Sequence, residues 1–108
     1  MEFICGVVDR DGCRRIFSAE SRPTLENIDD LGTQTPFMFY EWGPAASVEG
    51  SVRTAKAILS SVTNREEVFV HARRYAEDVV RGRLGTDRMW ILPVSEVELW
   101  LTENRKVA

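Results

Sequence analysis

The chain has 108 residues, enough for one domain with a single hydrophobic core and too few for two. Hydrophobic residues make up 44% and charged residues 29%, a globular composition that excludes the disordered and membrane classes. A net charge of −3 argues against non-specific binding to nucleic acid. Because the chain lacks both a long apolar run and the basic region of a signal peptide, we expect a cytoplasmic single domain over residues 1–108 without a membrane span.

A β-hairpin is predicted at the start of the chain. Residues 2–8 alternate as a strand does, and Asp11-Gly12 is a strong turn signal before a second strand over residues 13–17. The two cysteines, Cys5 and Cys13, lie on these strands, and a cytoplasmic setting favours reduced thiols. With His71 as the single histidine, the chain offers too few ligands for a metal, so we expect no metal and no cofactor.

An acidic segment and an aromatic segment follow. Residues 18–35 are polar, and a short helical turn is predicted around residues 24–31, decorated by the acidic side chains of Glu26, Asp29 and Asp30. Residues 37–42 are rich in aromatic side chains, which predicts a buried third strand. Gly43-Pro44 then ends that strand, because proline cannot continue the ladder.

The second half of the chain has helical periodicity. A helix is predicted over residues 48–62 with Ser47 as its N-cap, and a second begins at Asn64 and stops at Gly82 or Gly85. Residues 89–92 predict a fourth strand, and Ser95 starts a capping box for a last helix over residues 96–104. These elements predict an α+β fold, with about four mainly antiparallel strands covered on one face by the helices.

Candidate acid–base groups are few. His71 lies on the flank of the second helix, where a boundary residue is more common than a catalyst. Glu41 interrupts the aromatic strand, where a carboxylate needs water or a cation. It either faces solvent or lines a groove with His71 or Tyr75, which would be a small-ligand or enzyme site. No nucleophile elbow or phosphate-binding loop is present, so we expect a protein that is not an enzyme.

The second helix carries several arginines, Arg73 and Arg81 among them. The pairs Arg73–Glu77, Arg74–Asp78 and Glu77–Arg81 are each four residues apart, so most of this charge is expected to be paired within the helix. The alternative is a partner-binding face for protein or nucleic acid, since arginine suits bidentate contacts.

Five segments in order carry a resemblance to a family. They are Phe39-Tyr40-Glu41-Trp42-Gly43, residues 55–59, Tyr75 with Val79-Val80, Trp90-Ile91-Leu92, and Glu98-Leu99-Trp100-Leu101. In this order they resemble small prokaryotic and phage proteins of unassigned function, marked by a Phe-Glu-Trp-Gly box before an Ala- and Leu-rich helix. Residues 44–50 depart from the Gly- and Ser-rich stretch of that family. The resemblance implies a shared fold and a mobile-element setting, with no activity to carry over.

We therefore expect an accessory protein that binds a macromolecular partner, most specifically an anti-CRISPR-like inhibitor of a host defence complex. The expected partner-binding residues are the acidic Glu20, Glu26, Asp29 and Asp30, together with Glu41, Arg73 and Arg81. Nucleic-acid binding through the second-helix arginines is a further alternative, disfavoured by the net charge. Trp100 either completes the core of a monomer or anchors a homodimer through the last helix.

Overall fold

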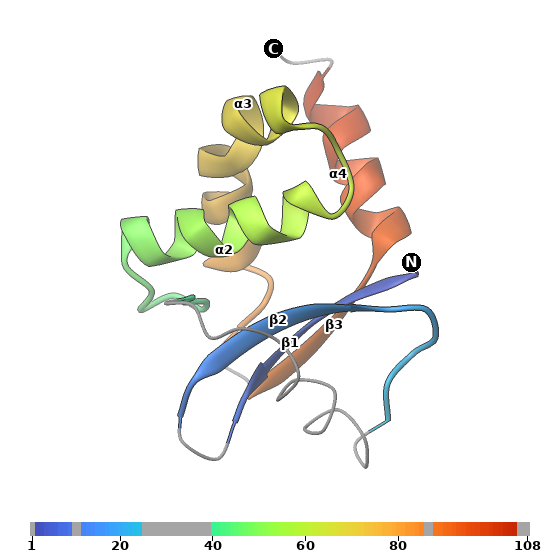
Figure 1. Ribbon diagram of the computed structural model, residues 1–108. Helices are drawn as coiled ribbons and strands as arrows, with labels where there is room; N and C mark the ends of the chain where they lie inside the picture. Colours follow the sequence, from blue (N-terminus) through green and yellow to red (C-terminus); the bar gives the residue numbers. More distant parts are fainter. Residues whose placement is uncertain (1, 10–11, 25–39, 86–87, 106–108) are drawn as a thin grey trace.

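The computed structural model describes residues 2–9, 12–24, 40–85 and 88–105. Along these residues run three strands, three α-helices and one π-helical turn: β1 Phe3–Val8, β2 Arg14–Ala19, α2 Val48–Ser60, α3 Arg65–Tyr75, η1 Ala76–Val80, β3 Met89–Pro93 and α4 Val94–Arg105. The sheet lies on one side of the molecule and the helices lie together on the other (Figure 1). The α+β class is confirmed.

The described strands form one antiparallel sheet in the order β2-β1-β3, so β1 is central. The register sets Gly6 of β1 opposite Ile16 of β2 and Trp90 of β3. The hairpin and the late tryptophan strand are thus confirmed, although β2 continues to Ala19, two residues past its predicted end at Phe17. The turn between β1 and β2 is closed by the Gly12 N–H, which donates to the Asp9 carbonyl at 3.0 Å. Gly12 has φ 80°, a conformation that favours glycine.

The predicted strand over residues 37–42 is not confirmed. Residues 37–39 lie outside the described residues, and Tyr40, Glu41 and Trp42 belong to no strand of the described sheet. Trp42 is nevertheless buried, because its ring packs edge-on against Trp90 with centroids 5.4 Å apart. The guanidinium of Arg14 lies 5.1 Å from the centre of the Trp42 ring. Residues 25–31, most of the predicted helical turn, also lie outside the described residues.

Helix starts are partly as predicted. Ser47 caps α2 by accepting from the Gly50 N–H at 3.0 Å, and Asn64 caps α3 by accepting from the Glu67 N–H at 2.9 Å. The last helix differs, because α4 begins at Val94 directly after β3 and Ser95 lies inside its first turn. The Val94 N–H donates to the carbonyl of Glu2 at 2.9 Å, so the backbone just before β1 satisfies a group that a side-chain cap would otherwise serve.

The second helix does not continue unchanged to Gly82. It ends at Tyr75 and passes into η1, where the Arg81 N–H donates to the Ala76 carbonyl at 2.9 Å, five residues back. The wider turn places the neighbours Val79 and Val80 both in the core, at 4% and 0% exposure. In a regular α-helix, neighbouring side chains point about 100° apart, so one of two adjacent valines would be more exposed than the other.

The core has two parts, one on each face of the sheet. The larger part lies between sheet and helices and includes Ile4, Trp90, Leu59, Tyr75 and Trp100, and the smaller comprises Cys5, Val7 and Phe17. Cys5 and Cys13 are free thiols, and burial raises the pKa of the Cys5 thiol to about 11. Within the described part of the chain, no helix has the length and apolar character that a membrane span requires.

Candidate functional site

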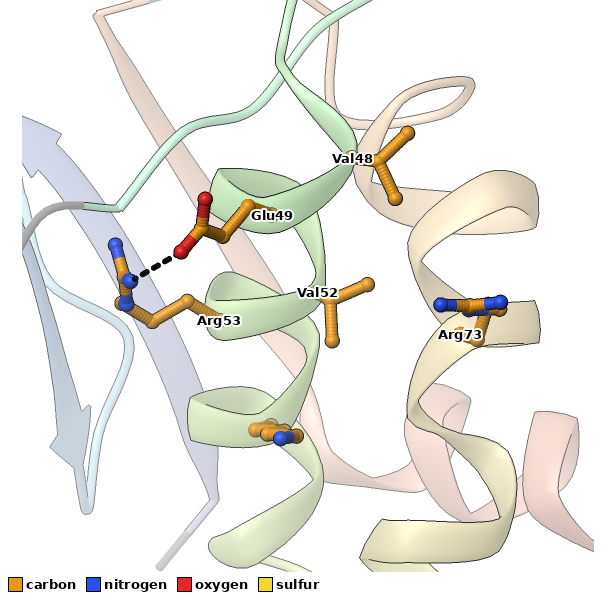
Figure 2. Close-up of a pocket in the computed structure, with 6 residues that line it drawn as sticks. Val48, Glu49, Val52, Arg53 and Arg73 are labelled. Atoms are coloured by element: carbon orange, nitrogen blue, oxygen red, sulfur yellow. Dashed lines mark ion pairs between the residues drawn. The ribbon is translucent and has the colours of Figure 1, made fainter.

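The clearest candidate site is a groove between α2 and α3, which we call the α2/α3 groove. It has a volume of about 540 Å³ and is lined by apolar, acidic and basic side chains: Val48, Glu49, Val52, Arg53, Lys56 and Arg73. Figure 2 shows Val48 and Val52 projecting from α2 toward α3, which carries Arg73. Both valines lie outside the buried stripe of α2, and Val48 is 51% exposed. The groove therefore has an apolar floor and a mostly basic rim.

The charges of the α2/α3 groove are incompletely balanced. Glu49 and Arg53 form an exposed ion pair at 3.6 Å, drawn as a dashed line in Figure 2. Arg73 and Lys56 form no ion pair with any residue that the structure describes. The expected Arg73–Glu77 pair is absent because the Glu77 carboxylate pairs with Arg81 at 3.0 Å. A negatively charged ligand would thus meet two cations that no described residue neutralises.

Arg81 and Arg74 have partners inside the molecule. The Glu77–Arg81 pair is confirmed, whereas the expected Arg74–Asp78 pair is replaced by other contacts. Arg74 donates to the Asn104 side chain of α4 at 3.5 Å, and Asp78 accepts from the Trp100 indole at 3.3 Å. Of the two predicted arginines, Arg73 faces the groove and Arg81 is held by its own helix.

An exposed apolar patch adjoins the groove on α3. It is formed by Phe69 and Val70, which are 83% and 60% exposed. Arg65 and Glu66, one turn earlier in α3, line the same surface hollow. Phe69 precedes Arg73 by four residues, so the two side chains are neighbours on one helix face. We name these two apolar residues the Phe69 patch. Sequence reasoning missed the patch, although an aromatic residue lying just off the buried stripe at Val68 and Ala72 was a usable signal.

Glu41 supports the start of α2. Its carboxylate accepts hydrogen bonds from the Ser47 hydroxyl at 2.5 Å and from the Ser47 N–H at 3.3 Å. The side-chain hydrogen bond from Ser47 is the main reason that the pKa of Glu41 lies below its ordinary value. Its backbone N–H donates to the Thr54 hydroxyl at 3.0 Å. Glu41 is half-buried, and these contacts give it a role in holding the loop against α2.

His71 and Tyr75 contact α4, at the other side of α3. The His71 ring is 7% exposed and lies edge-on to Trp100 with centroids 6.0 Å apart. Tyr75 packs on the same indole at 4.9 Å. The cavity that Tyr75 lines includes neither Glu41 nor His71. Glu41 therefore lies at the start of α2 and His71 lies against α4, and no described contact joins them.

The predicted acidic surface is described only in part. Glu20 follows β2 and is exposed, whereas Glu26, Asp29 and Asp30 lie outside the described residues. Among the residues that the structure describes, no three His, Cys, Asp or Glu side chains are grouped as metal ligands would be.

Trp100 belongs to the core. It is 5% exposed and its indole N–H donates to Asp78, so it does not lie on the surface of α4. Leu99 is the large apolar side chain of α4 that remains 59% exposed.

Comparison with protein-family models, with curated proteins and with solved structures gives no match for this chain. The resemblance to the family marked by the Phe-Glu-Trp-Gly box therefore stays a prediction. Function is inferred from the geometry and charge of the α2/α3 groove and of the Phe69 patch beside it.

Proposed function

We propose that this protein acts without catalysis, by binding a protein partner along the α2/α3 groove. The observation that carries the proposal is a groove with two basic groups that form no ion pair with a described residue, next to an exposed phenylalanine on α3. Arg73 and Lys56 supply the charge and Phe69, at 83% exposure, supplies the apolar contact. Large exposed aromatic residues are more common at binding surfaces than elsewhere on a protein.

The partner that fits is an amphipathic acidic segment, helical when bound. Its carboxylates would pair with Arg73 and Lys56, because arginine binds carboxylates bidentately. Its apolar face would cover Val48, Val52 and the Phe69 patch, releasing about 25 cal/mol for each Å² of apolar surface removed from water. A helix laid into a groove between two helices is a recurrent mode of peptide recognition.

Nucleic acid fits this surface less well. The chain carries a net charge of −3, and Arg81, one of the two arginines expected to contact phosphates, is paired with Glu77. Valine side chains form the floor of the groove, and they give a phosphate backbone nothing to bind. Binding to nucleic acid is therefore an outcome that the test below must exclude.

The test is an NMR titration of the labelled protein with three probes. These are a synthetic acidic amphipathic peptide, the same peptide with each Glu replaced by Lys, and a single-stranded oligonucleotide. We expect the acidic peptide alone to shift the amide signals of Val52, Phe69 and Arg73 saturably. Equal binding of the basic peptide, or preferential binding of the oligonucleotide, would show that the proposal is wrong.

Two variants localise the effect. Arg73→Glu reverses the charge of one basic group and Phe69→Ser removes the large apolar contact. Each is expected to weaken peptide binding by about ten-fold, the first because a charged contact is lost and the second because apolar surface is no longer covered. Both side chains are exposed, so the fold should be kept. Arg88→Glu, an exposed arginine outside the groove, is the matched control and should bind as the parent does.

Inhibition of a host defence complex is a narrower form of this proposal, supported by the resemblance alone. It would use the acidic residues Glu20, Glu26, Asp29 and Asp30 against a basic groove of the partner, opposite in sign to the α2/α3 groove. A variant with all four neutralised to Gln or Asn should then lose inhibition while still binding the acidic peptide. Unchanged inhibition by that variant would reject charge mimicry.

A further inference from the structure

Glu49 is the one acidic side chain among the described residues that line the α2/α3 groove. The other charged side chains of that lining are basic: Arg53, Lys56 and Arg73. Glu49 lies in the first turn of α2 and is exposed. A carboxylate at the rim of a basic groove attracts the same cations as an acidic ligand does. An acidic partner therefore has to compete with a carboxylate of the protein itself.

The contact between Glu49 and Arg53 is weak enough to be exchanged. The Arg53 Nη2 and the Glu49 Oε1 lie 3.6 Å apart, and the two side chains are 38% and 87% exposed, respectively (Figure 2). Exposed ion pairs contribute little free energy, because water screens them and two long side chains must be ordered. A carboxylate of a bound segment contacts the guanidinium where water has been partly removed, so the attraction is stronger.

Arg53 is placed to serve a bound segment once Glu49 leaves it. Arg53 and Lys56 are three residues apart in α2, which makes them neighbours on the helix surface with Cβ atoms about 5–6 Å apart. Arg53 is half-buried. Burial raises the pKa of Tyr40, and the charge of Arg53 opposes that rise, so the guanidinium lies near the loop before α2. Arg53 thus stays at the rim of the groove, next to Lys56, whether or not Glu49 is paired with it.

We propose that Glu49 regulates the α2/α3 groove by occupying Arg53 until an acidic partner replaces it. The carboxylate of the partner pairs with Arg53, the Glu49 side chain turns into solvent, and the bound segment then contacts three cations, Arg53, Lys56 and Arg73. This inference rests on the proposed function and makes the partner more specific. The segment that fits carries at least three acidic residues, because a segment with fewer has no carboxylate to exchange for Glu49.

Isothermal titration with the synthetic acidic amphipathic peptide tests the role of Glu49. Glu49→Gln removes the competing carboxylate with little change in size, so the peptide should bind about three-fold more tightly than to the parent, the value of one exposed ion pair. Glu98→Gln removes the same charge at an exposed position of α4 that does not line the groove, and should bind as the parent does. Equal affinities of Glu49→Gln and Glu98→Gln would overturn the proposal.

Arg53→Gln tests the exchange itself. It should weaken binding of the peptide by about three-fold, whereas an Arg53 that stays paired with Glu49 would contribute nothing. In the double variant Glu49→Gln/Arg53→Gln, the gain from Glu49→Gln should disappear, because Glu49 acts through Arg53. A gain of the same size in both backgrounds would mean direct repulsion of the peptide by Glu49 and would reject the exchange.

The affinity of the parent separates this inference from the proposed function. A parent that binds the acidic peptide, with Glu49→Gln no tighter, keeps the groove as a binding site and rejects the exchange alone. A parent that does not bind the peptide rejects both. Circular dichroism of each variant checks the fold, and Glu49→Gln, at an exposed position, still decides the question if Arg53→Gln disturbs it.

Discussion

The carboxylate of Glu41 occupies the space beside Gly50 that any side chain at position 50 would need. Gly50 lies in the first turn of α2, where its N–H donates to the Ser47 hydroxyl, and that hydroxyl in turn donates to Glu41. A carboxylate at a helix N-terminus is stabilised by the helix dipole. Glycine inside a helix costs about 1 kcal/mol relative to alanine. Here the glycine leaves room for a residue from outside the helix.

This relationship predicts coupling between the two positions. In a Glu41→Ala background, Gly50→Ala should stabilise the protein by about 1 kcal/mol, the ordinary gain in helix propensity. In the parent, the new methyl group displaces the carboxylate from Ser47, so the gain should be cancelled. Urea denaturation of the four proteins measures a coupling energy of about 1–2 kcal/mol. Equal effects of Gly50→Ala in both backgrounds would show that Glu41 does not hold this position.

Acid should weaken the contact between α3 and the end of α4. Glu67 accepts hydrogen bonds from Arg105 and from the Thr63 hydroxyl. The hydrogen bonds from Arg105 are the main reason that the pKa of Glu67 falls from 4.5 to about 2. A pKa lower in the folded state means that the stabilisation is complete above about pH 4.5 and is lost as the pH falls toward 2.

The measurement is stability against pH for the parent and for Glu67→Gln. The parent should lose more stability than the variant between pH 4.5 and 2, since the variant has no group to titrate at this position. Glu66→Gln, in the same first turn and exposed, is the control and should follow the parent. Parallel curves for the parent and Glu67→Gln would contradict the role of Glu67.

Features decided by neighbouring residues were predictable from the sequence. Ser47 and Asn64 cap their helices as expected, because a cap needs only a short polar side chain and an N–H three residues on. Asp11-Gly12 likewise predicts the hairpin, since the turn requires a positive φ at the glycine. Glu77 pairs with Arg81 and not with Arg73, which follows the preference for an acidic residue that lies N-terminal to its basic partner.

Features decided by distant residues were not predictable. The aromatic run before Gly43 indicates burial, but whether it is buried as a strand depends on Trp90, which packs against Trp42 from β3. The sequence carries no local signal for the π-helical turn, because what favours the turn is the burial of both Val79 and Val80 in the core. The α2/α3 groove and the Phe69 patch beside it depend on how the helices pack, so only Arg73 among the groove residues was singled out in advance.

Gly6 is expected to resist substitution because of Trp90. The two residues face each other across β1 and β3, and a Cβ at Gly6 would overlap the indole ring. Gly6→Ala should therefore destabilise the protein by about 1–3 kcal/mol, as overpacking does in other cores. In a Trp90→Phe background the destabilisation by Gly6→Ala should be smaller, because the phenyl ring leaves more room. Trp90→Phe itself removes no hydrogen bond to a described residue, since the Trp90 indole nitrogen has no partner among them. Thermal denaturation of the three variants gives the comparison.

Trp100 should act on stability and leave the oligomeric state unchanged. Its indole is 5% exposed, packs on Tyr75 and His71, and donates to Asp78, so Trp100→Ala should cost about 3–5 kcal/mol. Leu99→Ser is the matched change on the same helix, at a side chain that is 59% exposed, and should cost little stability.

Light scattering separates the two possible roles of α4, core element and dimer interface. We expect the parent and Leu99→Ser to have the mass of a monomer, and Trp100→Ala to unfold at lower urea. A parent dimer that Leu99→Ser dissociates into folded monomers would instead make α4 an interface between copies of the chain.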